Sequence, residues 1–376
     1  MNNQSTKLIS SIITMCLTVV IVSQSITSIV IKPRLYDGTI NELGRYSFTF
    51  DAYEYIDENT ENAVIAIGSS KMREIFDGTL FSDNTIFEGD FYNLAYAGDR
   101  PYVRMIEIDS IISIKPRLVI LEFGPNVLSK LNTPLDDATA GRMSQLMSLN
   151  NKWHQQTWED MLLKEDKEIL PLERIEQISY LAEYTPEALE SSLNYQLEIE
   201  EPVYSCDKKT GNVRCVPEMN DDYYKEYIQY PIQFSNSLER IKAGSSSITI
   251  EDFYGPMLDK YINRSYHNPE GHYNKNQMGF EFIIDSLRAN DIEVMLVGLP
   301  YNPVLIDRLA NSQWDYYNQT LEQYDLLEDV TVVDFIWSDF WVEEDFNDFT
   351  HASREGEYKF ADNLCPLIDE LFCGNC

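Results

Sequence analysis

Short, uninterrupted apolar runs constrain the fold of this chain more than any other feature of its sequence. The clearest is Ala-Val-Ile-Ala-Ile at residues 63–67, closed by Gly68. Runs of this length without polar alternation are typical of strands buried on both faces of a parallel sheet. Further candidate strands lie at residues 91–95, 117–123, 292–300 and 330–335.

Helical patterns separate several of these candidate strands. Apolar residues recur at helical intervals within residues 102–114, 278–289 and 306–327. A strand, a helix and a second strand in this order form a right-handed parallel crossover. The sequence therefore predicts an α/β fold, a flavodoxin-like three-layer α/β/α sandwich around a five-stranded parallel sheet.

The α/β pattern is interrupted once, so two segments that are far apart in the sequence make one domain. Residues 62–127 and 276–376 carry the predicted strands and helices. Residues 128–275 between them are rich in Glu and Tyr and are predicted to form a large, mainly helical insertion or cap. Ahead of the domain we assign a short tail at residues 1–7, an apolar segment at 8–31 and a polar, acidic stalk at 32–61.

The apolar segment at residues 8–31 is long enough to cross a membrane as a helix, since about 20 apolar residues span the hydrocarbon core. A cleavable signal peptide with its apolar core at residues 9–22 is the alternative. No clear cleavage motif of the A-x-A type is present, which favours an uncleaved transmembrane anchor. The flanking charges, Lys7 against Lys32 and Arg34, leave its orientation open.

The cysteines indicate an oxidising compartment. Cys206 and Cys215 bracket a polar, turn-forming segment that would bring the two thiols together, so we predict a disulfide between them. Cys365, Cys373 and Cys376 cluster at the C-terminus, where one pair and one leftover thiol is the simplest arrangement, and a zinc site there lacks an obvious fourth ligand. Together with the apolar segment, these features predict that most of the chain lies outside the cytoplasm, at a cell surface or in a periplasm-like space.

The charge balance excludes two kinds of partner. The chain contains 29 Lys and Arg against 62 Asp and Glu, a formal net charge of −33. Such a chain would repel nucleic acid and anionic membrane surfaces. No metal or organic cofactor is implied either, because His267 and His272 flank a short loop without a third close ligand.

The residues that leave each predicted strand are the place to look for chemistry, because ligands bind beyond the carboxyl ends of the strands in an open parallel sheet. Ser70 follows the first strand, Gly98 the second and Asn126 the third. Asp348 and His351 follow the fifth. We therefore expect all of them at one rim of the sheet.

These residue types suit a serine nucleophile and its supports. A serine hydroxyl is a poor nucleophile until a base such as His351 takes its proton, and Asp348 can orient the imidazole and stabilise its charged form. The backbone N–H groups of Ser70 and Gly98 and the side-chain amide of Asn126 would donate to the oxyanion of a tetrahedral intermediate.

Each of these residues also has a structural alternative. Ser70 could cap a helix in a tight turn, Asn126 could order its loop, and Gly98 could be needed only for a positive φ. Ser69 could compete as the nucleophile. Three cationic side chains lie close to these residues in the sequence, namely Lys71, Arg73 and Arg100. They could bind an anionic acyl donor or acceptor. The alternative is that they form ion pairs with the acidic surface.

The same residues resemble the four short blocks of the SGNH (GDSL-like) hydrolases, in the right order and on the right elements. The counterparts are Gly68-Ser69-Ser70, Gly98 at the end of residues 93–98, Gly124-Pro125-Asn126, and Asp348-x-x-His351. The resemblance covers about residues 62–127 and 278–370. Ser69 and Val127 each stand where the family has Asp, and both departures are similar to the membrane-anchored branch that includes the D-alanyl transfer proteins of teichoic acid and the acetylation proteins of alginate synthesis.

The resemblance implies a membrane-anchored, extracytoplasmic serine esterase or O-acyltransferase with Ser70, Asp348 and His351 as its triad. An acyl group, expected to be acetyl, would be carried on Ser70 and passed to water or to a hydroxyl of an envelope glycan. In the transferase version, a membrane protein would deliver the acyl group. The alternative is a catalytically inactive SGNH-fold protein whose Tyr-rich insertion binds glycan or another envelope protein. A periplasmic-type binding protein would leave Ser70 and the Asp-x-x-His pair without a reason to occur together.

Overall fold

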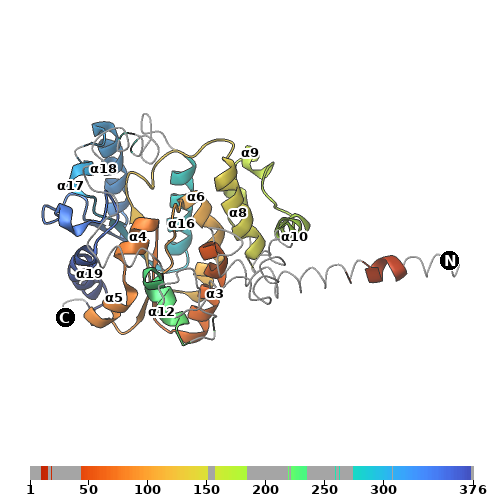
Figure 1. Ribbon diagram of the computed structural model, residues 1–376, viewed down its shortest axis with the longest axis horizontal. Helices are drawn as coiled ribbons and strands as arrows, with labels where there is room; N and C mark the ends of the chain where they lie inside the picture. The colour runs from red at the N-terminus through yellow and green to blue at the C-terminus, as the bar shows by residue number, and fades with distance from the viewer. Residues whose placement is uncertain are drawn as a thin grey trace, which may run out of the picture.

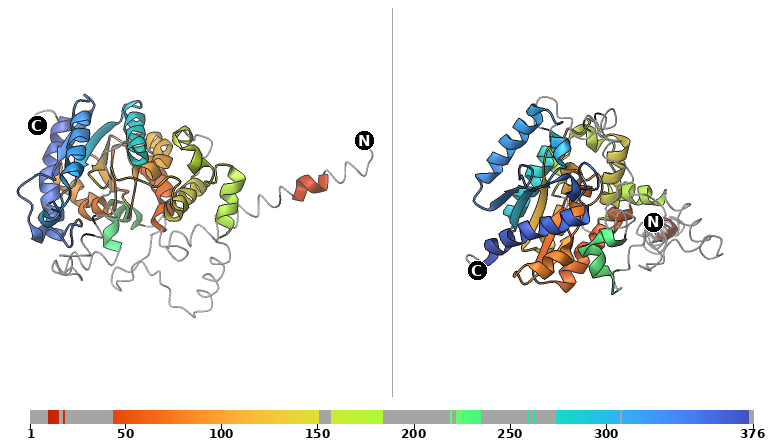
Figure 2. Two further views of the ribbon diagram at one scale, coloured as in Figure 1. Left: turned by 90° about the horizontal axis from the view of Figure 1, so that it is seen from above. Right: turned by 60° about the vertical axis from the view of Figure 1, so that its left-hand side comes forward.

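The predicted α/β architecture is confirmed by a computed structural model, in which a parallel sheet lies between helices (Figures 1 and 2). The structure describes residues 44–150, 157–183, 222–234, 274–306 and 308–373, together with 10–15, 18, 219, 259 and 262. Within these residues the sheet has five strands in the order β2-β1-β3-β4-β5, all parallel, which is consistent with a flavodoxin-like fold. The strands are β1 (Ala63–Ile67), β2 (Asp90–Asn93), β3 (Leu118–Phe123), β4 (Glu293–Gly298) and β5 (Val330–Asp334).

The two faces of the sheet pack into separate hydrophobic clusters because successive side chains on a strand point in opposite directions. On β1, Ile65 and Ile67 belong to one cluster, while Val64 and Ala66 belong to the other. All five residues of β1 and all six of β3 are buried, as expected for strands covered on both sides. The apolar runs in the sequence are therefore explained by burial on both faces.

Different helices cover each face. The first face is covered by α3 (Gly44–Asn59), α6 (Pro101–Arg104), η2 (Met105–Glu107), α7 (Ile108–Ile114), α8 (Asp137–Leu149), α16 (Lys275–Arg288) and α18 (Asn311–Asp325). The second face is covered by α4 (Ser70–Ile75), α5 (Gly78–Asn84) and α19 (Arg354–Cys373). The last helix, α19, lies alongside α5, although the two are far apart in the sequence (Figure 2).

Residues 44–59 of the predicted stalk form helix α3, which packs on the core, so this part of the segment belongs to the α/β domain. Phe50, Tyr53 and Ile56 recur at helical spacing and are buried in the main core. The Tyr53 hydroxyl donates a hydrogen bond of 2.7 Å to the Glu107 carboxylate. The polar composition of this segment therefore gave no indication that it forms a helix packed into the core of the α/β domain.

The described parts of the insertion pack on the α/β domain. Met143, Leu146 and Met147 of α8 are buried in the main core. Two shorter elements, α12 (Tyr224–Gln229) and η4 (Pro231–Phe234), lie near β2, α5 and α4. The remaining described elements of this region are η3 (Glu159–Met161), α9 (Lys164–Lys167) and α10 (Arg174–Ala182).

Several sequence predictions fall outside the described residues. They concern Cys206 and Cys215, His267 and His272, and most of the apolar segment at residues 8–31. No helix in the described part of the chain has the length and apolarity needed to cross a bilayer. Cys365 is buried in α19 as a free thiol, and none of the described residues forms a disulfide.

Candidate active site

His351 lies within hydrogen-bonding distance of both Ser70 and Asp348. Ser70 is the first residue of α4, directly after β1, and His351 lies in the loop before α19. The Ser70 Oγ is 2.8 Å from His351 Nε2, and His351 Nδ1 is 2.7 Å from Asp348 Oδ2. Ser70 and His351 are 281 residues apart in the sequence. All three side chains are half-buried.

The loop that carries His351 is held in shape by Asp348 itself. Asp348 Oδ1 accepts hydrogen bonds from the backbone N–H groups of Thr350 (2.8 Å) and His351 (2.9 Å), leaving Oδ2 for the imidazole. The Asn302 N–H, just beyond β4, donates to the Phe349 carbonyl at 3.0 Å. One carboxylate therefore fixes both the loop and the ring.

The electrostatics of the pair favour an ionised Asp348 and a basic His351. Burial acts to raise the pKa of Asp348, but His351 and the hydrogen bonds to the carboxylate lower it to about 2. Burial acts to lower the pKa of His351, but the carboxylates of Glu74 and Asp348 raise it to about 9. Glu74 is buried on α4, four residues after Ser70, so it lies on the same side of that helix as the serine.

The contacts of Ser69 make it a poorer candidate nucleophile than Ser70. The Ser69 hydroxyl donates to Glu122 Oε1 at 3.0 Å, and the Ser69 N–H donates to Glu122 Oε2 at 2.6 Å. The Ser69 Oγ also accepts a weak bond from the Lys71 N–H, which makes Ser69 the N-cap of α4. Ser69 is thus buried and occupied, whereas the Ser70 hydroxyl faces the imidazole.

The other two predicted oxyanion donors lie beyond β2 and β3, as expected. Gly98 has a φ of 68°, a conformation that favours glycine, and its carbonyl accepts a hydrogen bond of 2.8 Å from Arg142. Asn126 is 9% exposed. Its side-chain amide donates a hydrogen bond to Glu122 and accepts one from the Tyr301 hydroxyl. Arg100 holds the Asn126 carbonyl at 2.5 Å and the Ser129 hydroxyl at 2.9 Å.

Lys71 forms a buried network beneath the site with Glu122 and Tyr301, two residues that the sequence analysis did not assign to it. Lys71 forms an ion pair with Glu122, with Nζ and Oε1 3.1 Å apart and the side chains 5% and 1% exposed. Lys71 also donates to the Tyr301 hydroxyl at 2.9 Å. The sequence indicated both Glu122 and Tyr301. Glu122 is a charged residue within an apolar strand, and Tyr301 follows β4 at the same rim of the sheet.

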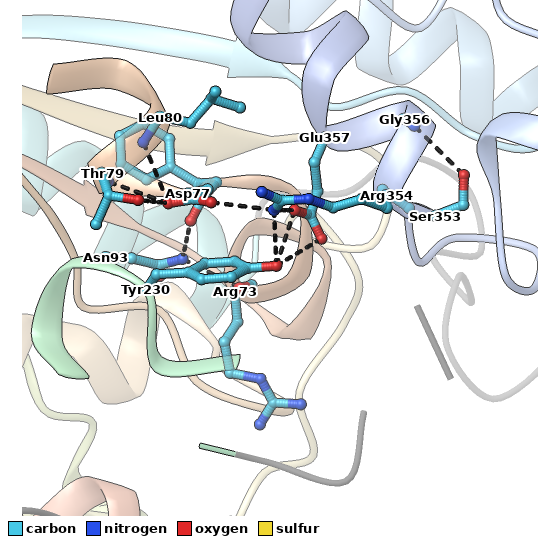
Figure 3. A network of polar contacts seen from close by, with 12 residues as sticks. Arg73, Asp77, Thr79, Leu80, Asn93, Tyr230, Ser353, Arg354, Gly356 and Glu357 are labelled. Atoms are coloured by element: carbon cyan, nitrogen blue, oxygen red, sulfur yellow. Dashed lines mark hydrogen bonds and ion pairs between the residues drawn. The ribbon is translucent and has the colours of Figure 1, made fainter. Parts of the chain in front are cut away.

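A second polar network anchors the start of α19, three residues beyond His351 (Figure 3). Arg354 Nη1 donates to Asp77 Oδ2 at 3.0 Å and also contacts Glu357. The Tyr230 hydroxyl, from the insertion, lies 2.8 Å from Glu357 Oε2 and 3.1 Å from Arg354 Nη1. Burial raises the pKa of Glu357 to about 8, although Arg354 opposes this shift. This network ties the loop of His351 to α5 and to the insertion.

The three cations near the site have different surroundings. Lys71 and Arg100 are engaged by the internal contacts described above. Arg73 extends away from the network of Figure 3 and forms an ion pair with the adjacent Glu74, at 3.3 Å. Among the described residues, the Arg73 Nε has no hydrogen-bond partner.

Comparison with models of known protein families and with curated proteins finds no match to this chain. The geometry of the site must therefore carry the functional argument.

Proposed function

We propose that this chain is a serine esterase or O-acyltransferase of the SGNH type that acts on acyl esters, with acetyl the expected group, of envelope glycans. The observation that carries the proposal is the continuous hydrogen-bonded line from Ser70 through His351 to Asp348, built from the two ends of the α/β domain. A serine, an imidazole and a carboxylate in this order are the parts of an activated nucleophile.

The reaction would proceed in two halves. His351 Nε2 takes the Ser70 proton as Oγ attacks the ester carbonyl, and the imidazolium then gives that proton to the departing alcohol, leaving an acyl-Ser70 ester. In the second half, His351 takes a proton from water or from a sugar hydroxyl, whose oxygen attacks the acyl group and releases Ser70. Asp348 stays ionised throughout, in line with its lowered pKa.

The oxyanion of each tetrahedral intermediate would accept hydrogen bonds from the Ser70 and Gly98 N–H groups and from Asn126. We further propose that the N-terminal segment anchors the chain in a membrane with the α/β domain outside the cytoplasm. For the transferase reaction, a membrane protein would supply the acyl donor.

The first test is labelling by a fluorophosphonate, together with acetate release from a chromogenic acetyl ester. We expect the parent to be labelled at Ser70 and to hydrolyse the ester, and Ser70→Ala to lose both properties. Ser69→Ala is the matched control and should still be labelled at residue 70. A parent that neither reacts with the probe nor releases acetate would contradict the proposal and favour an inactive glycan- or protein-binding member.

The activity should rise with pH, because only the neutral imidazole can act as the base. With a His351 pKa of about 9, we expect kcat/KM to increase about tenfold per pH unit up to that value and then level off. The Glu74→Gln substitution removes a carboxylate that raises this pKa, so the rising limb should move to lower pH. A pH profile of ester hydrolysis from about pH 6 to about pH 10 measures both effects.

Glu328→Gln is the control for that profile, since it removes the same charge from an exposed position remote from the site. An unchanged profile in Glu74→Gln, or an equal shift in Glu328→Gln, would show that Glu74 does not set the basicity of His351.

A further inference from the structure

We infer that Tyr301 and Lys71 are positioning residues that fix the orientation of the Asn126 amide, so that its N–H points to the oxyanion. The inference rests on the proposed function, because it concerns the same site.

The orientation of the amide follows from the chemistry of its neighbours. An ammonium group only donates hydrogen bonds, so the Tyr301 hydroxyl accepts from Lys71 Nζ at 2.9 Å and must direct its own hydrogen elsewhere. That hydrogen goes to Asn126 Oδ1, 3.0 Å away. On the other side, the Glu122 carboxylate only accepts, so the group 3.2 Å from Oε1 must be Asn126 Nδ2.

This orientation of the amide requires a protonated Lys71 and an ionised Glu122, and the surroundings of both groups favour these charge states. Burial acts to lower the pKa of Lys71, but Tyr301 and Glu122 raise it overall. Burial acts to raise the pKa of Glu122, but Lys71 and the hydrogen bonds from Ser69 lower it overall. Lys71 therefore stays protonated and Glu122 ionised, and the Lys71 Nζ also lies 4.1 Å from the centre of the Tyr301 ring.

One amide hydrogen remains for the substrate. Asn126 Nδ2 has two hydrogens, of which one is used by Glu122. A flipped amide would present Oδ1 to the oxyanion, which is repulsive, and would also break both bonds that hold the side chain. The network thus selects the orientation that stabilises negative charge.

The backbone around the network leaves room for these side chains. A Cβ atom at Gly68 would lie 2.6 Å from Glu122 Oε2, and one at Gly124 would lie 3.1 Å from the Tyr301 hydroxyl. The glycines of the first and third blocks therefore accommodate this network.

A double-mutant cycle tests whether Tyr301 acts through Asn126. Tyr301→Phe keeps the ring and should lower kcat for the acetyl ester about tenfold with little change in KM. Asn126→Ala should lower kcat about 100-fold. If Tyr301 works by orienting the amide, the double variant should be no slower than Asn126→Ala alone. The rate of fluorophosphonate labelling provides a second readout that is independent of the acyl acceptor.

Tyr92→Phe is the matched control, because it removes another buried tyrosine hydroxyl, which contacts Thr60 and Asp90 near the amino ends of the strands, at the rim opposite the site. It should leave kcat within about twofold of the parent. Equal effects of Tyr301→Phe in the parent and in the Asn126→Ala background, or no effect in the parent, would overturn the inference. Loss of activity in Ser70→Ala would then still support the proposed function, whereas a parent without ester hydrolysis or labelling would overturn both.

Discussion

Replacing His351 by alanine is expected to lower kcat for acetyl-ester hydrolysis on the order of 10⁵-fold, about as much as Ser70→Ala. The imidazole is the group within 2.8 Å of the Ser70 hydroxyl, so its removal leaves a serine without a base. Because nucleophile and base act as a unit, the double variant should be no slower than either single variant. Single-turnover and steady-state rates of the purified proteins measure this effect.

Asp348→Asn provides the comparison within the same loop. The amide oxygen can still accept from the Thr350 and His351 N–H groups, so the loop should keep its shape. The imidazole would lose its charged partner, and we expect kcat to fall about 10⁴-fold. Activity that survives in His351→Ala, or that falls additively in the double variant, would mean that another group activates Ser70.

Lys71→Met should have the largest effect on stability. It leaves the Glu122 carboxylate buried without its cation, and breaking such a pair costs about 3–5 kcal/mol of the free energy of unfolding. Both side chains are nearly inaccessible, at 5% and 1% exposed, so water cannot replace the lost partner. Denaturant-induced unfolding followed by far-ultraviolet circular dichroism measures the change.

Two further variants separate the buried charge from other effects. Adding Glu122→Gln to Lys71→Met removes the unpaired charge and should recover most of the lost stability. Lys225→Met breaks an ion pair with Asp90 in which the lysine is 42% exposed, and should cost less than about 1 kcal/mol. A Lys71→Met protein as stable as Lys225→Met would show that Glu122 is compensated in some other way.

The pattern of apolar runs, together with the residues that follow each run, was sufficient to predict the sheet and the neighbourhood of Ser70. Each apolar run became a strand within a few residues, and the residues after β1 and β5 meet across the rim. The same rule applied to the exit of β4 would have singled out Tyr301. Lys71 was considered as a possible anion ligand or as a partner of the acidic surface, because its contact with Tyr301 joins positions 230 residues apart in the sequence.

Helix α3 shows where local pattern is not enough. Its buried positions include Thr49 and Tyr53, so the side that packs on the core is not distinguished by apolar residues alone. Tyr53 can be buried because Glu107, on η2, accepts its hydrogen. Such a partner is known only once the chain is folded, and the segment therefore reads as a polar stalk in the sequence.

The distance in sequence between Ser70 and His351 also has a consequence for biosynthesis. A nascent chain that has been made up to residue 127 contains β1, β2 and β3 together with Ser70 and Asn126, but it contains no His351. In the proposed mechanism, the serine is activated only after β4 and β5 have joined the sheet and the loop before α19 has docked. Truncated products that end within residues 128–275 would thus carry the nucleophile in an inert form, and hydrolytic activity would report on completion of the whole chain.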